Sequence, residues 1–182
     1  PLTGGMTAKE ISDGSVIFED ENLKISAFKV FHEPIEPALG YKFEYKDRVL
    51  VISGDTRYDS ELIKSFKGAD VLFCEVISPD IVDRFIKVAE QQNDAKLKKI
   101  LVDILDYHIS PLDAVDLANE AGVRHLVYYH LTPTLPTEIR FLSDKFFFEG
   151  VDEAIENWTA STDGTMVVLP SNSKEILISE IN

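Results

Sequence analysis

Apolar and polar side chains alternate with a period of two in the first third of the chain. The alternation runs through residues 23–27 and again through residues 41–45, and it is typical of strands with one buried and one solvated face. Residues 49–52 are instead a continuous apolar run, which predicts a strand covered on both faces.

The middle of the chain changes to alternating helical and strand patterns. Residues 60–67 predict a short helix that Gly68 ends, and residues 69–76 predict a second buried strand. A long and mostly helical stretch follows over residues 79–106. Strand–helix–strand order of this kind implies parallel strands with helices packed on the sheet.

The next helix has clear boundary signals at both ends. Ser110 is a candidate N-cap, Pro111 occupies the first helical position, and Gly122 follows the last residue of the apolar stripe. Residues 123–129 then predict another strand.

The pattern after residue 130 is weaker. It predicts a short helix over residues 152–158 and a terminal hairpin that pairs residues 165–169 with residues 175–179. No internal repeat or low-complexity linker divides the chain, so we expect one domain or a large piece of one.

Three polar residues stand where predicted strands end. His32 follows the first strand, Asp55 follows the run at residues 49–52, and His130 follows the strand at residues 123–129. Side chains at the carboxyl ends of neighbouring strands converge on one edge of a sheet. Two imidazoles and a carboxylate are a suitable ligand set for zinc, manganese or iron, although a turn or a surface position is the commoner explanation for each residue taken alone.

A carboxylate and an imidazole form a second candidate pair. Glu75 ends the strand at residues 69–76, and His108 precedes the N-cap at Ser110. A carboxylate can fix the tautomer of an imidazole and raise its pKa, so that the imidazole can donate a proton to a leaving group. A strand-end carboxylate and a loop histidine are the simpler alternatives, and we interpret His125, inside a strand, as structural.

Charge and cysteine content limit the classes of partner and compartment. The net charge is −14, from 18 basic and 32 acidic side chains, and a field of this sign repels nucleic acid. The basic cluster at residues 96–99 is interpreted as the solvated face of a helix. Cys74 is the only cysteine, which excludes an intramolecular disulfide and favours a reducing compartment, and its apolar surroundings predict a buried, inert thiol.

Several motifs resemble those of the metallo-β-lactamase superfamily. They are Val-Phe-His at 30–32, Gly-Tyr-Lys-Phe at 40–43, Val-Ile-Ser-Gly-Asp-Thr at 51–56, Gly-Ala-Asp-Val-Leu-Phe-Cys-Glu at 68–75, Asp-Tyr-His-Ile-Ser at 106–110 and His-Leu-Val-Tyr-Tyr-His-Leu at 125–131. Their order and spacing are similar to the ribonuclease Z-like branch of metal-dependent hydrolases over residues 23–133. The resemblance implies an α/β fold, the C-terminal half of a four-layer αββα sandwich, with a mixed sheet and helices on its outer face.

The resemblance also implies roles for single residues. His32 and His130 would each ligate one of two divalent metal ions and Asp55 would bridge both, with zinc expected and manganese or iron as alternatives. His108 and Glu75 would handle the leaving-group proton. The implied activity is hydrolysis by a metal-bound hydroxide.

The chain departs from the superfamily pattern at its first signature. The His-x-His-x-Asp-His loop, which supplies four further ligands, is absent, and the chain has only 4 histidines. We therefore interpret residues 1–182 as the C-terminal portion of a single metallo-β-lactamase-like domain. Its N-terminal portion would lie outside this chain, and the metal site would be incomplete and inactive without it.

The expected substrate follows from the charge and from a missing insertion. Ribonuclease Z enzymes carry a long tRNA-binding arm between the residues equivalent to His32 and Asp55, whereas 23 positions separate them here. The sequence analysis thus predicts a small ester-type substrate, no nucleic-acid or membrane partner, and association with a second copy or with the missing N-terminal portion. The alternatives are a ribonuclease Z-like phosphodiesterase or nuclease and a non-catalytic, truncated binding module.

Overall fold

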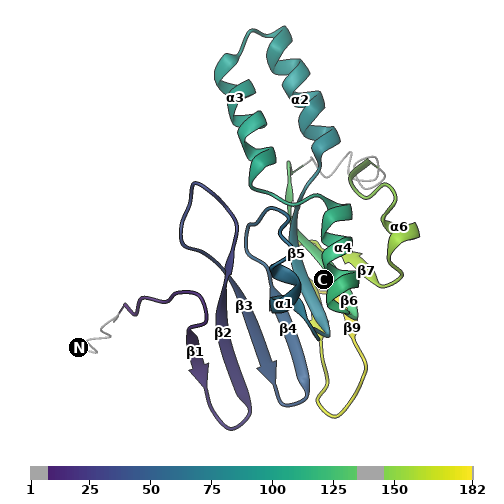
Figure 1. Ribbon diagram of the computed structural model, residues 1–182. Coiled ribbons are helices and arrows are strands. Elements are labelled where there is room, and N and C mark those ends of the chain that lie inside the picture. The colour runs from purple at the N-terminus through teal and green to yellow at the C-terminus, as the bar shows by residue number, and fades with distance from the viewer. Residues whose placement is uncertain (1–7, 135–145, 182) are drawn as a thin grey trace, which may run out of the picture.

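The main sheet of the protein has seven strands that follow one another in chain order (Figure 1). The computed structural model describes residues 8–134 and 146–181. The strands are β1 (Val16–Glu19), β2 (Leu23–Val30), β3 (Ala38–Tyr45), β4 (Arg48–Ile52), β5 (Val71–Ile77), β6 (His125–Thr132) and β7 (Trp158–Ala160). A separate two-stranded sheet consists of β8 (Thr165–Val168) and β9 (Leu177–Glu180).

The sheet is mixed, which confirms the α/β fold class. Strands β1 to β4 pair antiparallel, and β4 to β7 pair parallel. The parallel connections carry the helices, which are α1 (Leu62–Phe66), α2 (Pro79–Gln91), α3 (Ala95–Asp103), the 3-10 turn η1 (Ile104–Asp106), α4 (Pro111–Ala121) and α6 (Val151–Ala154). Because β2 runs in the same direction as β4, β5 and β6, the carboxyl ends of all four strands lie at one edge of the sheet.

One face of the sheet packs against α1 and α4 and forms the core. Leu62 and Phe66 of α1 and the apolar stripe of α4 are buried against this face. Val51 and Cys74 point into the same core and are fully buried, as expected for an inert thiol. Burial raises the pKa of the Cys74 thiol further, so the thiolate does not form near neutral pH.

The opposite face of the sheet is only partly covered. Side chains alternate along a strand, so Leu50 and Ile52 point away from the helices, and both are half-buried. The prediction that residues 49–52 are buried is therefore correct for Val51 and wrong for Leu50 and Ile52. Leu50 and Ile52 line an apolar hollow of about 350 Å³. Its other lining residues are Phe43, Tyr45, Arg48, Val167 and Leu169.

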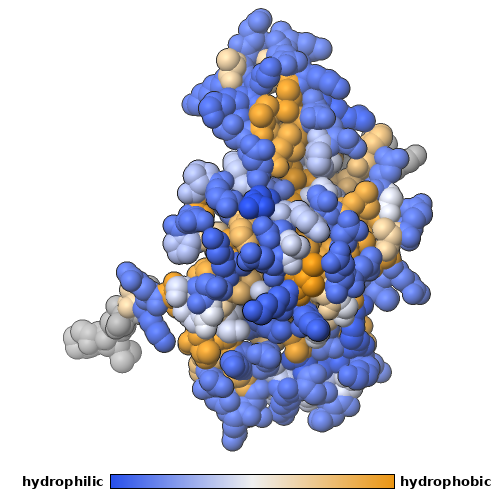
Figure 2. Space-filling view, viewed as in Figure 1, coloured by the Kyte–Doolittle hydropathy of each residue, from blue (hydrophilic) through white to orange (hydrophobic). Residues whose placement is uncertain are grey.

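Helices α2 and α3 form a hairpin that projects away from the sheet (Figure 1). The hairpin has its own small core, in which Val82 and Ala89 of α2 pack against Leu101 of α3. An apolar stripe runs along the hairpin in Figure 2. The exposed apolar residues of the two helices are Phe85 and Val88 in α2 and Leu97, Ile100 and Val102 in α3. None of the helices in the described ranges has the length and apolar character that crossing a bilayer requires.

Local sequence signals correctly predicted several boundaries of helices and strands and failed for one helix. Ser110 caps α4, because its Oγ accepts from the backbone N of Asp113, and Gly122 ends the helix in the left-handed conformation. The predicted terminal hairpin is confirmed by the pairing of β8 with β9. The predicted helix over residues 152–158 is wrong in its second half, because Trp158 pairs with Leu126 and begins β7.

Candidate metal and hydrolytic site

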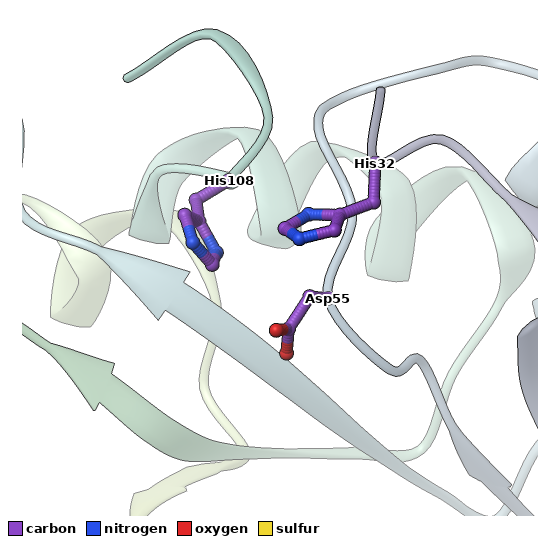
Figure 3. A group of neighbouring side chains, drawn as sticks. All are labelled: His32, Asp55 and His108. Carbon is purple, nitrogen blue, oxygen red and sulfur yellow. The ribbon is translucent and has the colours of Figure 1, made fainter. Parts of the chain in front are cut away.

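Four predicted site residues lie together at the carboxyl edge of the sheet. His32 follows β2, Asp55 follows β4, His130 lies near the end of β6, and His108 precedes α4. One ligand atom each of His32, Asp55 and His108 lies within 4.8 Å of the others. In Figure 3 the two imidazoles lie beside each other above the carboxylate of Asp55, with ring centroids 5.2 Å apart.

His130 also lies beside Asp55 and His108. Its Nε2 lies 3.5 Å from Oδ1 of Asp55, and its ring centroid lies 6.0 Å from that of His108. The structure therefore brings together all three residues predicted as ligands, His32, Asp55 and His130. It also brings His108, predicted only as a proton donor, within ligand distance of the same carboxylate.

The loop that carries Asp55 is fixed by hydrogen bonds on both sides of the aspartate. Before it, the hydroxyl of Tyr129 accepts from the backbone N of Gly54 at 3.1 Å. After it, the backbone N of Thr56 donates to Oε1 of Glu75 at 2.9 Å. Thr56 Oγ1 accepts from the backbone N of Phe31 at 3.0 Å, so this loop and the residue before His32 are tied together.

Two glycines allow this loop to cross strand β3 at close range. A Cβ on Gly40 would lie 2.3 Å from the ring of Phe28 and 2.6 Å from the carbonyl O of Ser53. Gly54 has φ +67, and a Cβ there would meet the carbonyl O of Leu39 at 2.7 Å. The absence of a side chain at both positions is what allows the backbone beside Asp55 to lie so close to the strand.

The ring of His32 is oriented by a backbone carbonyl. Its Nδ1 lies 3.0 Å from the carbonyl O of Tyr107, and because a carbonyl only accepts, Nδ1 must be the protonated nitrogen. Nε2 is then left with a free lone pair. Hydrogen bonds of this kind commonly fix the tautomer of histidines that bind metals.

Glu75 and His108 form the predicted carboxylate–imidazole pair. Glu75 is completely buried, and its Oε1 accepts from Nδ1 of His108 at 3.0 Å. Burial raises the pKa of Glu75 above its ordinary value, although the hydrogen bond from His108 opposes this rise. Burial lowers the pKa of His108, but the hydrogen bond to Glu75 and the charges of Glu75 and Asp55 outweigh burial, so the net change is upward. The pair therefore favours a protonated imidazole at the site.

His130 occupies a β-bulge in strand β6. Glu75 pairs with Tyr129 and Val76 pairs with Leu131, so His130 is the extra residue between them. Its φ is 47°, a left-handed conformation that costs most residues about 1–2 kcal/mol. Bulges that redirect a side chain are common beside active sites, and this one turns His130 toward Asp55.

Substitution of His130 tests this backbone conformation. We expect His130→Gly to be more stable than His130→Ala by about 1 kcal/mol, because only glycine adopts a positive φ without strain. Urea denaturation of both variants measures the difference in the free energy of unfolding. At an ordinary strand position the order is reversed, so a more stable alanine variant would contradict the left-handed backbone.

The sequence did not reveal the residues that hold the site in place. Gly40, Thr56, Tyr107 and Tyr129 all lie inside motifs that carry the family resemblance, but none of them was assigned a role. A carbonyl or hydroxyl that supports a distant loop leaves no local pattern. His125 is confirmed as a strand residue away from the cluster, with Nε2 at 2.9 Å from Oγ1 of Thr159.

The donor set is chemically suited to divalent transition metals. Imidazole nitrogen and carboxylate oxygen are the ligands that zinc, manganese and iron accept in hydrolytic sites. His32, Asp55 and His108 have ligand atoms close enough to share one ion, and His130 is placed for a second beside Asp55.

Known protein families and sequences match most of the chain. A family model described as "Beta-lactamase superfamily domain" matches residues 3–131. Ribonuclease Z of Mycolicibacterium gilvum is 32% identical over 127 residues, which are 70% of this chain and 40% of that protein. Ribonuclease Z of Mycobacterium tuberculosis is 35% identical over 104 residues, 57% of this chain and 34% of that protein. The chain thus spans well under two thirds of the length of either relative.

Solved structures of low sequence identity share the fold. The metallo-beta-lactamase fold protein YhfI of Bacillus subtilis has a TM-score of 0.52 at 17% identity, covering 84% of this chain and 52% of that chain. The CmlA beta-hydroxylase has a TM-score of 0.54 at 9% identity, covering 85% of this chain and 32% of that chain. Since one neighbour is named a hydroxylase, these similarities support the architecture and do not indicate the reaction.

The relatives correct one prediction of the sequence analysis. A small-molecule substrate without a nucleic-acid partner was expected from the acidic charge and the short interval after His32. That expectation is contradicted, because the two relatives described above are named for an activity on RNA. Net charge failed as a guide because it averages over the surface, whereas binding depends on the local groups around the site.

Proposed function

This chain belongs to the metallo-β-lactamase superfamily, and from that membership we propose that it is the C-terminal portion of a metal-dependent phosphodiesterase acting on RNA. The observation that carries the proposal is the cluster of His32, Asp55, His108 and His130 at one edge of the sheet, in a chain 32% identical to a ribonuclease Z. The buried carboxylate of Glu75 is hydrogen-bonded to His108, and a carboxylate–imidazole pair of this kind is suited to proton transfer.

Each site residue has a proposed role. His32, Asp55 and His130 would hold two divalent metal ions, with Asp55 between them. Bound metals would activate a water nucleophile and neutralise charge on the phosphate. His108, held by Glu75, would donate a proton to the leaving-group oxygen, because the hydrogen bond to Glu75 and the charges of Glu75 and Asp55 raise its pKa and so favour the protonated imidazole.

We further propose that an N-terminal portion outside this chain completes the site and covers the open face of the sheet. Leu50 and Ile52 line the apolar hollow on that face, and apolar hollows of this kind are favourable packing surfaces. The hollow is also lined by Arg48, which is 2% exposed and whose buried Nε has no partner among the described residues. A packed segment would bring apolar side chains and an acceptor for this N–H. The sequence encoded upstream of Pro1 tests this proposal, since a His-x-His-x-Asp-His loop is expected there.

Substrate cleavage by the complete enzyme tests the proposed function. We expect hydrolysis of a tRNA precursor and of bis(p-nitrophenyl) phosphate, loss of both activities after metal removal by a chelator, and recovery on addition of zinc or manganese. Hydrolysis of an ester such as p-nitrophenyl acetate serves as the control. Ester hydrolysis without cleavage of either phosphodiester would overturn the proposal.

A further inference from the structure

The ring of Tyr107 contacts the imidazole rings of His32 and His108 in the candidate site. Its ring centroid lies 4.8 Å from that of His32 and 5.1 Å from that of His108. The interplanar angles are 82° and 51°, so neither imidazole is stacked parallel on the phenol ring. The side chain is partly exposed, which leaves part of the ring surface open to a ligand.

The backbone holds Tyr107 rigidly in this position. Its carbonyl O accepts from Nδ1 of His32, and the next residue, His108, is held by Glu75. The hydrogen bond from the backbone N of Ile77 to the carbonyl O of Ile109, at 2.8 Å, ties the same segment to strand β5. An aromatic residue whose backbone is already held in place loses less conformational entropy when a ligand stacks on its ring.

Stacking on an aromatic ring is one source of affinity for RNA that this site can offer. Arg57, two residues after Asp55, is paired with Glu33 and Asp59. A cation that is already paired with carboxylates contributes less to the neutralisation of phosphates than a free one. Single-stranded RNA is also recognised by bases that stack on aromatic rings, and stacking does not depend on net charge.

We propose that Tyr107 is a stacking platform for the nucleobase next to the scissile phosphate. This inference rests on the proposed function and adds to it a specificity-determining residue. Tyr107 takes no part in proton transfer, and its backbone carbonyl keeps its role in orienting His32 whatever side chain the residue carries.

The test combines a protein variant with a modified substrate. Tyr107→Ala and Tyr107→Phe are prepared in the complete, metal-loaded enzyme, and kcat and KM are measured on a short RNA with either a normal or an abasic nucleotide beside the cleaved bond. We expect Tyr107→Ala to raise KM on the normal RNA by about tenfold to a hundredfold, the range typical of one stacked base. On the abasic RNA, the same variant should match the unsubstituted enzyme, because the stacking partner is already gone.

Tyr107→Phe is the matched control, since it keeps the ring and removes only the hydroxyl. It should resemble the unsubstituted enzyme on both RNAs, and a loss equal to that of Tyr107→Ala would overturn stacking in favour of a hydrogen bond. Equal losses for Tyr107→Ala on the normal and abasic RNAs would overturn it in favour of a purely structural role. If the unsubstituted enzyme cleaves neither RNA, the proposed function itself is wrong, which is a different result from cleavage that is insensitive to Tyr107.

Discussion

Replacement of Asp55 by alanine is expected to abolish hydrolysis by the complete enzyme. Among the described residues, Asp55 is the one carboxylate in the cluster, and its ligand atom lies within 4.8 Å of those of His32 and His108. Its loss would remove both a ligand and the negative charge that offsets the bound cations. Even residues that only hydrogen-bond to metal ligands cost about 10- to 100-fold when they are removed, so the loss here should exceed a hundredfold.

Two controls accompany this measurement. One shows that the Asp55 variant is still folded, and the other shows that the loss of a carboxylate elsewhere does not reduce activity. The Asp55 side chain is 36% exposed, so its truncation should leave the thermal unfolding midpoint almost unchanged. Asp106→Ala removes an exposed carboxylate from the segment before His108, outside the cluster, and should keep full activity. If Asp55→Ala is fully active with its metal content intact, Asp55 is not a ligand and the site is misassigned.

Gly40→Ala is expected to be the most destabilising single change at the glycines of this site. The new Cβ would lie 2.3 Å from the buried ring of Phe28 and 2.6 Å from the carbonyl O of Ser53. One neighbour is a core side chain and the other is backbone, so neither can move without disturbing the packing around it. Overpacking of this kind typically costs about 1–3 kcal/mol, and we expect the upper part of that range.

Gly68→Ala is the matched control, because it adds the same methyl group where nothing lies within 4 Å. Its φ is +76, so alanine there is strained by about 1 kcal/mol without any steric overlap. Chemical denaturation compares the free energies of unfolding. Metal binding provides a second readout, since Gly40→Ala should also displace the backbone beside Asp55, whereas Gly68→Ala should not. A Gly40 variant as stable as the Gly68 variant would contradict the close approach of β3 to this loop.

Much of the fold was accessible from local patterns in the chain. The alternation at residues 23–27 and 41–45 and the cap signals at Ser110 and Gly122 correspond to β2, β3 and α4. Such signals succeed because they depend on neighbours a few residues apart. The helix predicted over residues 152–158 failed at Trp158, where pairing with Leu126, distant in sequence, overrode the local preference.

For the site, the sequence determined which residue types stand at the strand ends, and thus that His32, Asp55 and His130 would reach one edge of the sheet. The hydrogen bond between Glu75 and His108, expected on chemical grounds, is present in the structure. Tertiary structure alone decided the rest. The carbonyl of Tyr107 orients His32, and the β-bulge turns His130 toward Asp55, because each contact joins segments that only the folded sheet brings together. No pattern of neighbouring residues encodes such contacts.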